Sequence, residues 1–214
     1  IHNFIPFEIS VSPDRKRLRK NFAGDDEYVL THISNFRPLK RVTDLVPIIK
    51  KVSQHKKVKL LMVGDGPERY KTEEQCRREN ICQQVFFLGK QENIQDILAI
   101  SDLVLIPSAS ESFGLVALEA LAFGVPCVST NAGGLPEVNR HGETGFTVNI
   151  GDLDAFAEAI FVLKTFSSFL KCSITSSELF RKCILSDLAL PFLGRHVLDR
   201  KQHIIKALNA LVLK

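Results

Sequence analysis

The chain has 214 residues, of which 45% are hydrophobic and 24% charged, as in an ordinary globular protein. No apolar stretch approaches the ~20 residues that a membrane span needs, and the first residues lack a signal-peptide pattern. A net charge of +4 is too small and too little patterned for a nucleic-acid surface, although it suits a small polyanionic ligand. We therefore expect one large α/β domain, or one domain with an appendage, without a membrane span or a nucleic-acid partner.

The cysteines and the first residues indicate the setting of the chain. Five cysteines are present, with no C-x-x-C pair and no histidine at metal-ligand spacing, so neither a disulfide framework nor a zinc site is predicted. A reducing cytoplasm fits best. Residues 1–12 are irregular and begin without methionine, so we expect a linker remnant and a fragment of a longer polypeptide.

Strand and helix patterns alternate along the chain. Strands are predicted at residues 28–33, 59–63, 85–88, 103–106, 126–129 and 145–148. Helices are predicted at 14–22, 44–52, 68–80, 94–100, 113–123 and 155–170, with a loop at 131–136. This order favours right-handed βαβ units and a parallel sheet with helices on both faces, over residues 13–163. Residues 164–214 are predicted to be a helical C-terminal segment.

Parallel sheets bind ligands at the carboxyl ends of their strands, so the residues after each strand are the candidates. Glu111 and Glu119 follow the strand at 103–106, one in a loop and one two turns into a helix. They are predicted to lie ~12 Å apart, beyond the ~5–10 Å carboxylate pairs of glycoside hydrolases. Between them Ser112 and Gly114 mark a helix start that attracts phosphate, and a carboxylate accepts hydrogen bonds from a sugar diol. The pattern suggests a nucleotide sugar, although two solvated glutamates explain it better when it is taken alone.

A basic loop follows the strand at 28–33. It contains Asn35, Arg37, Lys40 and Arg41. Arginine can hold a diphosphate bidentately and lysine acts as a compact charge, so this loop could neutralise a leaving nucleoside diphosphate. A solvated basic turn is the alternative.

Glycine turns follow three further strands. Gly64 and Gly66 form a tight turn that is explained as structure and can also line a cleft. Near Gln91, backbone groups could contact a base edge. Gly133 and Gly134 supply backbone donors for phosphate or sugar and are compatible with close packing of their loop. Neither G-x-G-x-x-G nor a P-loop occurs, which removes the main support for NAD or P-loop nucleotide binding.

Other chemistry-bearing side chains favour structural roles. His32 lies inside a predicted strand, His141 lies in a polar turn, and Cys127 lies in a buried strand. No serine or cysteine has a nucleophile-elbow context.

Together these loops resemble the C-terminal, nucleotide-sugar-binding domain of GT-B glycosyltransferases, in the large retaining family 4 that includes sucrose synthases. The resemblance covers residues 3–162. Its motifs are Lys40, Val63-Gly64-Asp65-Gly66-Pro67, Phe87-Leu88-Gly89, Ser101-Asp102, the E-x7-E pair Glu111 and Glu119, residues 122–126, Gly133-Gly134 with Glu137, and Gly142 with Gly145. It implies a Rossmann-like parallel sheet with helices on both faces, followed by a helical segment that matches the family poorly from about residue 166.

Segments 1–5, 33–42 and 87–91 look most like the branch of this family that serves bacillithiol biosynthesis. That likeness implies transfer of N-acetylglucosamine from UDP-GlcNAc to L-malate with retention. It implies no metal or redox cofactor, and it makes the UDP-sugar a substrate.

The resemblance also assigns roles by position. Glu119 would bind the ribose hydroxyls, Glu111 the donor sugar, Lys40 the departing diphosphate and Gln91 the uracil. Many relatives have an arginine five residues before the lysine; here that position is Asn35, and Arg37 would supply the charge. The implied catalytic residues are Glu111, Lys40 and Arg37, and the implied binding residues are Asn35, Gly64, Gln91, Ser112, Phe113, Gly114, Leu115, Val116, Glu119, Gly133 and Gly134.

The family's N-terminal domain, which supplies the acceptor site for a molecule such as L-malate, has no counterpart in these residues. We therefore expect this chain to bind donor without turnover on its own. Three alternatives stay open: another UDP- or GDP-sugar transferase, a non-catalytic nucleotide-sugar-binding module, and a phosphorylase or epimerase of the same architecture. A homo-oligomer is also left open.

Overall fold

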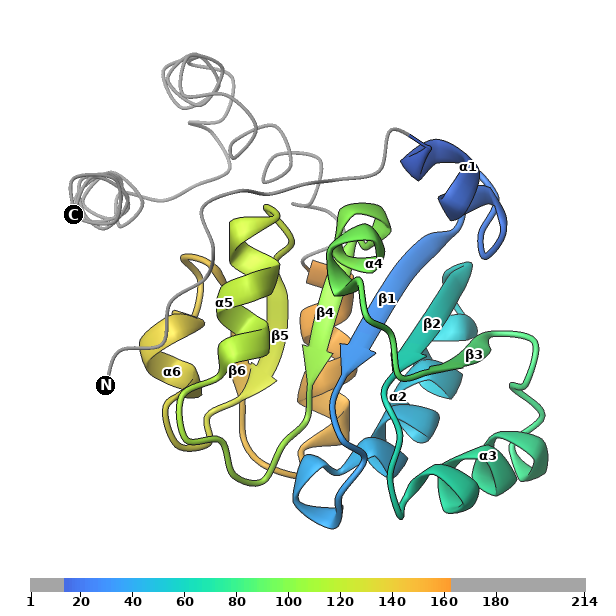
Figure 1. Ribbon diagram of the computed structural model, residues 1–214. Coiled ribbons are helices and arrows are strands. Elements are labelled where there is room, and N and C mark those ends of the chain that lie inside the picture. Colours follow the sequence, from blue (N-terminus) through green and yellow to red (C-terminus); the bar gives the residue numbers. More distant parts are fainter. Residues whose placement is uncertain (1–13, 163–214) are drawn as a thin grey trace. The chain divides into compact units, whose positions relative to one another are not determined.

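A six-stranded sheet, parallel throughout, forms the centre of the structure (Figure 1). The structure is a computed structural model and describes residues 14–162. The strand order is β3-β2-β1-β4-β5-β6. The strands are β1 (Tyr28–Ile33), β2 (Val58–Val63), β3 (Val85–Gly89), β4 (Leu103–Ile106), β5 (Cys127–Thr130) and β6 (Gly145–Val148).

The direction of chain progression reverses between β1 and β4. From β1 the chain moves outward to β2 and β3, and it then returns to place β4 on the other side of β1. Leu30 pairs with Leu103 and Thr31 with Val104 across this junction. Loops that leave neighbouring strands in opposite directions make such a junction the usual ligand position of doubly wound sheets. The loops after β1 and β4 are therefore placed to form a site.

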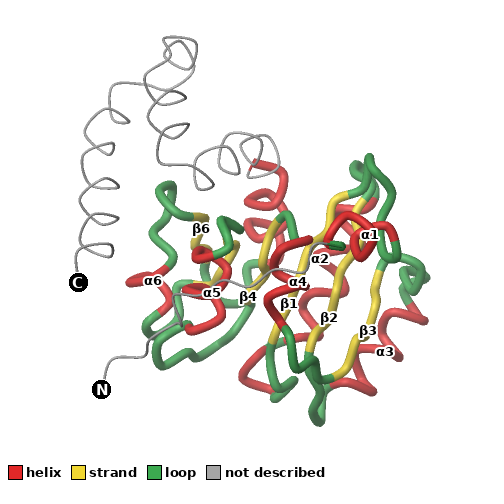
Figure 2. The backbone as a smooth tube through the Cα atoms, turned by 45° about the horizontal axis from the view of Figure 1, so that its top comes forward, coloured by secondary structure: helices red, strands yellow, loops and turns green. Residues whose placement is uncertain are grey.

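Helices cover both faces of the sheet (Figures 1 and 2). One face packs against α2 (Leu45–Ser53), α3 (Arg69–Arg78) and the helical residues 153–162, and the other packs against α1 (Arg15–Lys20), α4 (Ile94–Ile100) and α5 (Leu115–Ala122). Alternation along each strand divides the core, so that Leu30 and Leu60 belong to the first layer and Val29 and Leu61 to the second. Because both faces are covered, strands such as β4 are apolar at every position.

The predicted strands and helices between residues 14 and 162 are all present, with ends that differ by at most two residues. One helix was predicted to start too early, because α5 begins only at Leu115 after Gly114, whose φ of 85° is left-handed. The loop predicted at 131–136 ends early, since α6 (Leu135–Val138) starts with a proline in its first turn. Two 3₁₀ helices, η1 (Pro38–Lys40) and η2 (Val42–Asp44), shape the loop after β1 and were not predicted.

The predicted linker at 1–12 and the helices predicted beyond residue 162 lie outside the described residues. Within residues 14–162, no helix combines the length and the apolarity needed to cross a bilayer.

Candidate functional site

Two loops distant in sequence meet at the β1–β4 junction. Residues 34–41 follow β1, and residues 107–114 follow β4. The backbone N–H of Ala109 donates to the carbonyl of Leu39 at 2.7 Å, which ties the loops together. The basic loop and the loop of the first glutamate are therefore one unit at the carboxyl edge of the sheet.

Lys40 and Glu111 form an ion pair within this unit. The Lys40 ammonium donates to Oε1 of Glu111, and Ser108 Oγ donates to the same oxygen at 3.0 Å. The side chains of Lys40 and Glu111 are 17% and 19% exposed, so the pair is largely withdrawn from water. Each charge neutralises the other, and an anionic ligand would compete with Glu111 for the ammonium.

His32, in β1, is hydrogen-bonded to the first residue of the basic loop, Ser34. Its ring is fully buried, with Nδ1 2.8 Å from the carbonyl of Leu105 and Nε2 2.8 Å from Ser34 Oγ. Burial lowers the pKa of His32 to about 4, so the ring is neutral at physiological pH. Since a carbonyl only accepts, Nδ1 carries the proton, and the Ser34 hydroxyl donates to Nε2 while it accepts from the backbone N–H of Phe36. The structural role predicted for His32 is confirmed.

The backbone of Glu111 is fixed by the loop after β5. The N–H of Gly134 donates to the Glu111 carbonyl at 2.9 Å. Gly133 has a φ of 53°, and a Cβ there would lie 1.9 Å from the same carbonyl oxygen. The close packing expected of this glycine pair is present, and the Gly134 N–H is used within it.

The start of α5 has backbone donors that no other described residue uses. The N–H groups of residues 113–116 make no hydrogen bond to another described residue, while the carbonyl of Gly114 accepts from Ala117 and Leu118. A Cβ on Gly114 would lie 2.9 Å from Leu135 Cδ2, so glycine is required by packing as well as by φ. Ser112 and Leu115 are exposed, and Phe113 and Val116 are partly buried. Unsatisfied amides together with the helix dipole make this start suitable for an anion.

Glu119 differs from Glu111 in having no partner among the residues that the structure describes. Burial raises the pKa of Glu119, and its carboxylate makes no hydrogen bond or ion pair with another described residue. The expectation that it lies two turns into the helix was wrong, because α5 starts later and Glu119 lies about one turn in. A half-buried carboxylate without a partner is suited to accept hydrogen bonds from a ligand.

The remaining cations of the loop after β1 differ in their engagement. Arg41 has a left-handed φ of 50° and pairs with Asp44 at 2.7 Å. Arg37 is exposed, and its side chain contacts no other described residue by hydrogen bond or ion pair. Among the described residues, Lys40 and Arg41 each pair with a carboxylate, whereas Arg37 does not. Arg37 is therefore available to a ligand.

The glycine turn after β2 packs against the same loop. A Cβ on Gly64 would lie 1.7 Å from the Ser34 carbonyl oxygen, and one on Gly66 would lie 2.1 Å from that of Asn35. The structural role of this turn is confirmed.

Asn35 itself is exposed. Gln91, after β3, is also exposed and donates its side-chain amide to the Leu88 carbonyl at 2.7 Å.

Ser108 was missed in the sequence. Its hydroxyl reaches the Glu111 carboxylate from a fully buried position. A polar residue directly after the apolar run 103–107 was the available signal, but its acceptor is known only from the fold.

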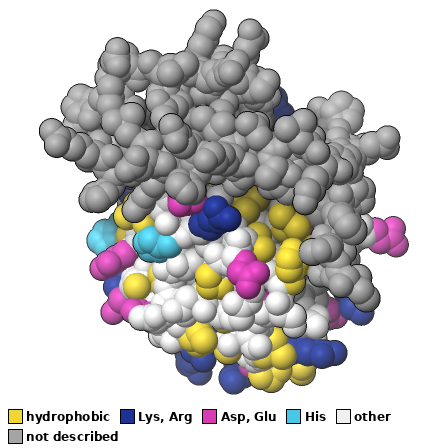
Figure 3. Space-filling view, turned by 90° about the vertical axis from the view of Figure 1, so that its left-hand side faces the viewer, with side chains coloured by type: hydrophobic (Ala, Val, Ile, Leu, Met, Phe, Trp, Pro, Cys, Tyr) yellow, Lys and Arg dark blue, Asp and Glu magenta, His cyan; other side chains and the backbone are white. Residues whose placement is uncertain are grey.

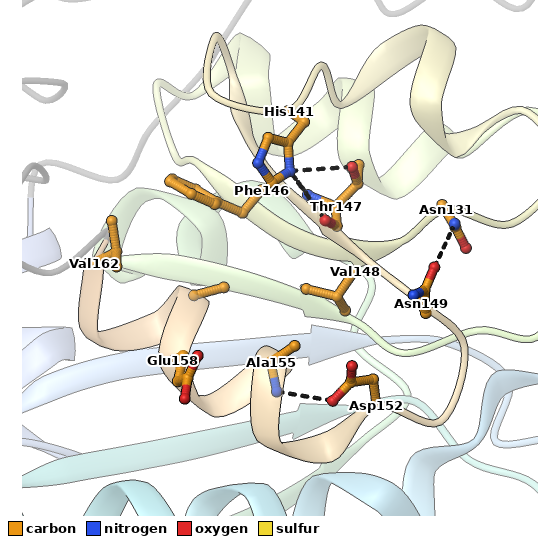
Figure 4. A pocket seen from close by; sticks show the side chains of 11 residues that line it. Asn131, His141, Phe146, Thr147, Val148, Asn149, Asp152, Ala155, Glu158 and Val162 are labelled. Atoms are coloured by element: carbon orange, nitrogen blue, oxygen red, sulfur yellow. Dashed lines mark hydrogen bonds between the residues drawn. The ribbon is translucent and has the colours of Figure 1, made fainter. Parts of the chain in front are cut away.

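A separate pocket lies at the β6 edge (Figure 4). It has a volume of about 380 Å³ and contains none of Lys40, Glu111 and Glu119. Its lining residues are Asn131, His141, Phe146, Thr147, Val148, Asn149, Asp152, Ala155, Glu158, Ala159 and Val162. His141 Nδ1 lies 3.2 Å from the backbone nitrogen and 3.0 Å from the carbonyl oxygen of Thr147, as expected for a structural histidine. On this side of the molecule, hydrophobic, acidic, basic and histidine side chains are interspersed (Figure 3).

Within residues 14–162, no group of three or more His, Cys, Asp or Glu side chains is arranged to hold a metal ion. Cys127 is fully buried in β5, and burial raises the pKa of its thiol to about 12, so the prediction of an inert core thiol is confirmed.

Comparison with known proteins agrees with this geometry. The family described as "Glycosyl transferases group 1" matches residues 14–165. The chain is 45% identical over 166 residues to N-acetyl-alpha-D-glucosaminyl L-malate synthase of Bacillus anthracis, covering 77% of this chain and 44% of that protein. It is 37% identical over 164 residues to D-inositol 3-phosphate glycosyltransferase of Rhodococcus erythropolis, covering 71% of this chain and 37% of that protein.

Among solved structures, HepE of Anabaena in complex with UDP aligns with a TM-score of 0.73 and 25% identity, over 98% of this chain and 57% of HepE. The chain thus spans about half the length of the proteins that it matches, and its sheet corresponds to the C-terminal half of the GT-B fold. The parallel sheet and the family match over residues 14–165 lead to the same assignment. The chain belongs to the glycosyl transferases of group 1.

Proposed function

We propose that this chain is the donor-binding half of a retaining glycosyltransferase that transfers N-acetylglucosamine from UDP-GlcNAc to L-malate. The acceptor would be bound by a domain outside this sequence. Support for the donor comes from the HepE structures, which contain UDP and UDP-glucose. Support for the sugar and the acceptor comes from the 45% identity to the Bacillus anthracis synthase.

The observation that carries the proposal is the set of complementary groups around the β1–β4 junction. Lys40 forms an ion pair with Glu111, and the backbone amides of residues 113–116 make no hydrogen bond to other described residues. Glu119 has no partner among the described residues. A UDP-sugar presents a diphosphate, a sugar and a ribose diol. Cationic and amide donors match the first, and carboxylates match the hydroxyls of the other two.

Donor binding changes the Lys40–Glu111 pair in this proposal. The diphosphate takes the Lys40 ammonium, and the Glu111 carboxylate then accepts from hydroxyl groups of the donor sugar. As the bond between the sugar and the diphosphate breaks, negative charge develops on the leaving oxygen. Lys40, Arg37 and the amides at the start of α5 stabilise that charge. Glu119 binds the ribose, and Gln91 lies near the base.

Calorimetry with UDP tests the site. Lys40→Ala and Glu119→Ala are each expected to weaken UDP binding by roughly tenfold or more, because each removes a charged partner of the nucleotide. Lys56→Ala is the matched control, since Lys56 is exposed and precedes β2, at the opposite edge of the sheet from the loops. Unchanged affinity in both site variants would refute the proposal.

A comparison of donors tests the sugar and the base. We expect UDP-GlcNAc to bind more tightly than UDP-glucose, and both to bind more tightly than GDP-mannose. A preference for UDP-glucose would favour another transferase of the same family, in line with the HepE complex. Equal binding of all three would remove the assignment to N-acetylglucosamine.

A further inference from the structure

Ser108 holds the Glu111 carboxylate independently of Lys40. The Oε1 atom of Glu111 accepts from both the Lys40 ammonium and the Ser108 hydroxyl, the latter at 3.0 Å. If the donor diphosphate takes the ammonium, as the proposed function requires, Ser108 becomes the donor that remains on this carboxylate. A carboxylate held by one fixed hydroxyl keeps its orientation when its cation leaves.

Ser108 is itself rigidly placed by the core of the sheet. It is fully buried, and its carbonyl accepts from the hydroxyl of Thr130, the last residue of β5, which is 1% exposed. The next residue is anchored as well, because the Ala109 N–H donates to the Leu39 carbonyl. Ser108 therefore takes its position from β4 and β5, whereas Glu111 lies in a loop. This allows the sheet to fix the direction of a loop carboxylate.

We propose that Ser108 is a positioning residue that aims Glu111 at the hydroxyl groups of the donor sugar, and that Thr130 braces Ser108 from β5. We call the two hydrogen bonds from Thr130 to Ser108 and from Ser108 to Glu111 the Ser108–Thr130 relay. The proposal rests on the proposed function, since it assigns this relay to the part of the donor site that recognises the sugar. It predicts that the affinities for UDP and for a UDP-sugar respond differently to loss of the relay. The relay contributes to binding of a UDP-sugar and not to binding of UDP, which lacks the sugar.

Calorimetry with UDP and with UDP-GlcNAc on the full chain measures this division. Ser108→Ala is expected to weaken UDP-GlcNAc binding by about five- to tenfold, the size of one hydrogen bond to a charged group, and to leave UDP affinity within about twofold. Ser108→Thr keeps the hydroxyl and is expected to restore the ratio. If Ser108 only filled the core, Ser108→Ala would instead lower the affinity for both ligands to the same extent.

Thr130 supplies a second pair of variants that does not touch the hydroxyl of Ser108. Thr130→Val removes the brace at nearly constant shape, and Thr130→Ser retains it. The valine variant is expected to shift the UDP-to-UDP-GlcNAc affinity ratio in the same direction as Ser108→Ala, and the serine variant to keep the wild-type ratio. Thermal unfolding of each variant identifies any that fails to fold.

The outcomes separate the two proposals. If the wild type binds UDP and UDP-GlcNAc but neither the Ser108→Ala nor the Thr130→Val variant changes the ratio, the relay is overturned and the donor site stands. Equal weakening of both ligands also overturns the relay. If the wild type binds neither ligand, the proposed function is overturned and the relay falls with it.

Discussion

The ammonium group of Lys40 contacts the carboxylate of Glu111, and this ion pair joins the loops that follow β1 and β4 across a sequence separation of 71 residues. Both side chains are less than one-fifth exposed, so each ion depends on the other for compensation. The pair forms at the junction where the strand order reverses, and it thereby places a cation and a carboxylate at the usual ligand position of the fold.

Replacing one partner of this ion pair is expected to destabilise the protein more than its share of the loss when both partners are replaced. Lys40→Met and Glu111→Gln should each lower the free energy of unfolding by about 1–3 kcal/mol, because each leaves one largely buried charge uncompensated. The double variant should lose less than the sum of the two. Urea unfolding of the four proteins measures the coupling. The exposed pair Lys51–Asp154 is the control, and it should show no measurable coupling.

Glu119→Gln is expected to weaken UDP binding without lowering stability at neutral pH. Burial raises the pKa of Glu119 in the folded state above its unfolded value, so the ionised carboxylate opposes folding above the unfolded pKa. This penalty is full above the folded pKa and disappears as the pH falls from the folded pKa to the unfolded one. The melting temperature at pH 7 should therefore be unchanged or higher in the glutamine variant. A lower melting temperature would indicate that the carboxylate has a stabilising partner, contrary to the geometry.

Acid should destabilise the protein through His32. Its pKa is about 4 in the folded state against 6.5 for an ordinary histidine, so the unfolded chain binds more protons between these values. Stability is full above pH 6.5 and is lost as the pH falls toward 4, by about 3 kcal/mol from this one group. Urea unfolding at several pH values measures the loss. His32→Gln should be less stable at pH 7 and should show a flatter pH dependence; an unchanged slope would contradict the burial of a neutral ring.

Two glycines with left-handed backbones should respond differently to alanine. Gly89 has a φ of 67°, and a Cβ there would meet nothing closer than Arg69 Nη1 at 3.8 Å, so Gly89→Ala should cost only about 1–2 kcal/mol of backbone strain. Gly133 has a φ of 53°, and a Cβ there would lie 1.9 Å from the Glu111 carbonyl oxygen. Gly133→Ala should therefore cost more, roughly 3 kcal/mol or above.

The Gly133 substitution should also displace Glu111, because Gly133 and Gly134 pack on its backbone. Affinity for UDP-GlcNAc is expected to fall in Gly133→Ala and to stay near the wild-type value in Gly89→Ala. Chemical denaturation gives the stability of each variant, and calorimetry gives its affinity. Similar costs for the two variants would show that the backbone of Glu111 tolerates displacement.

Local patterns in the sequence predicted most of the fold. The apolar run of β4 and the helical spacing of α4 were located to the residue, because burial on both faces of a strand and amphipathic periodicity are properties of short segments. The errors fell where the backbone conformation of one residue decides a boundary. Gly114 delays the start of α5, and the left-handed Arg41 separates η1 from η2.

By itself the sequence determined the alternating strands and helices, the loops that carry Lys40 and Glu111, and the helix that carries Glu119. Only the tertiary structure decided which of these groups meet. The pairing of β1 with β4 brings Lys40 onto Glu111, places Ser108 behind that carboxylate and leaves Glu119 without a partner among the described residues. The physical reason is range: periodicity and turn chemistry act within a few residues, whereas an ion pair depends on the order in which distant strands are assembled.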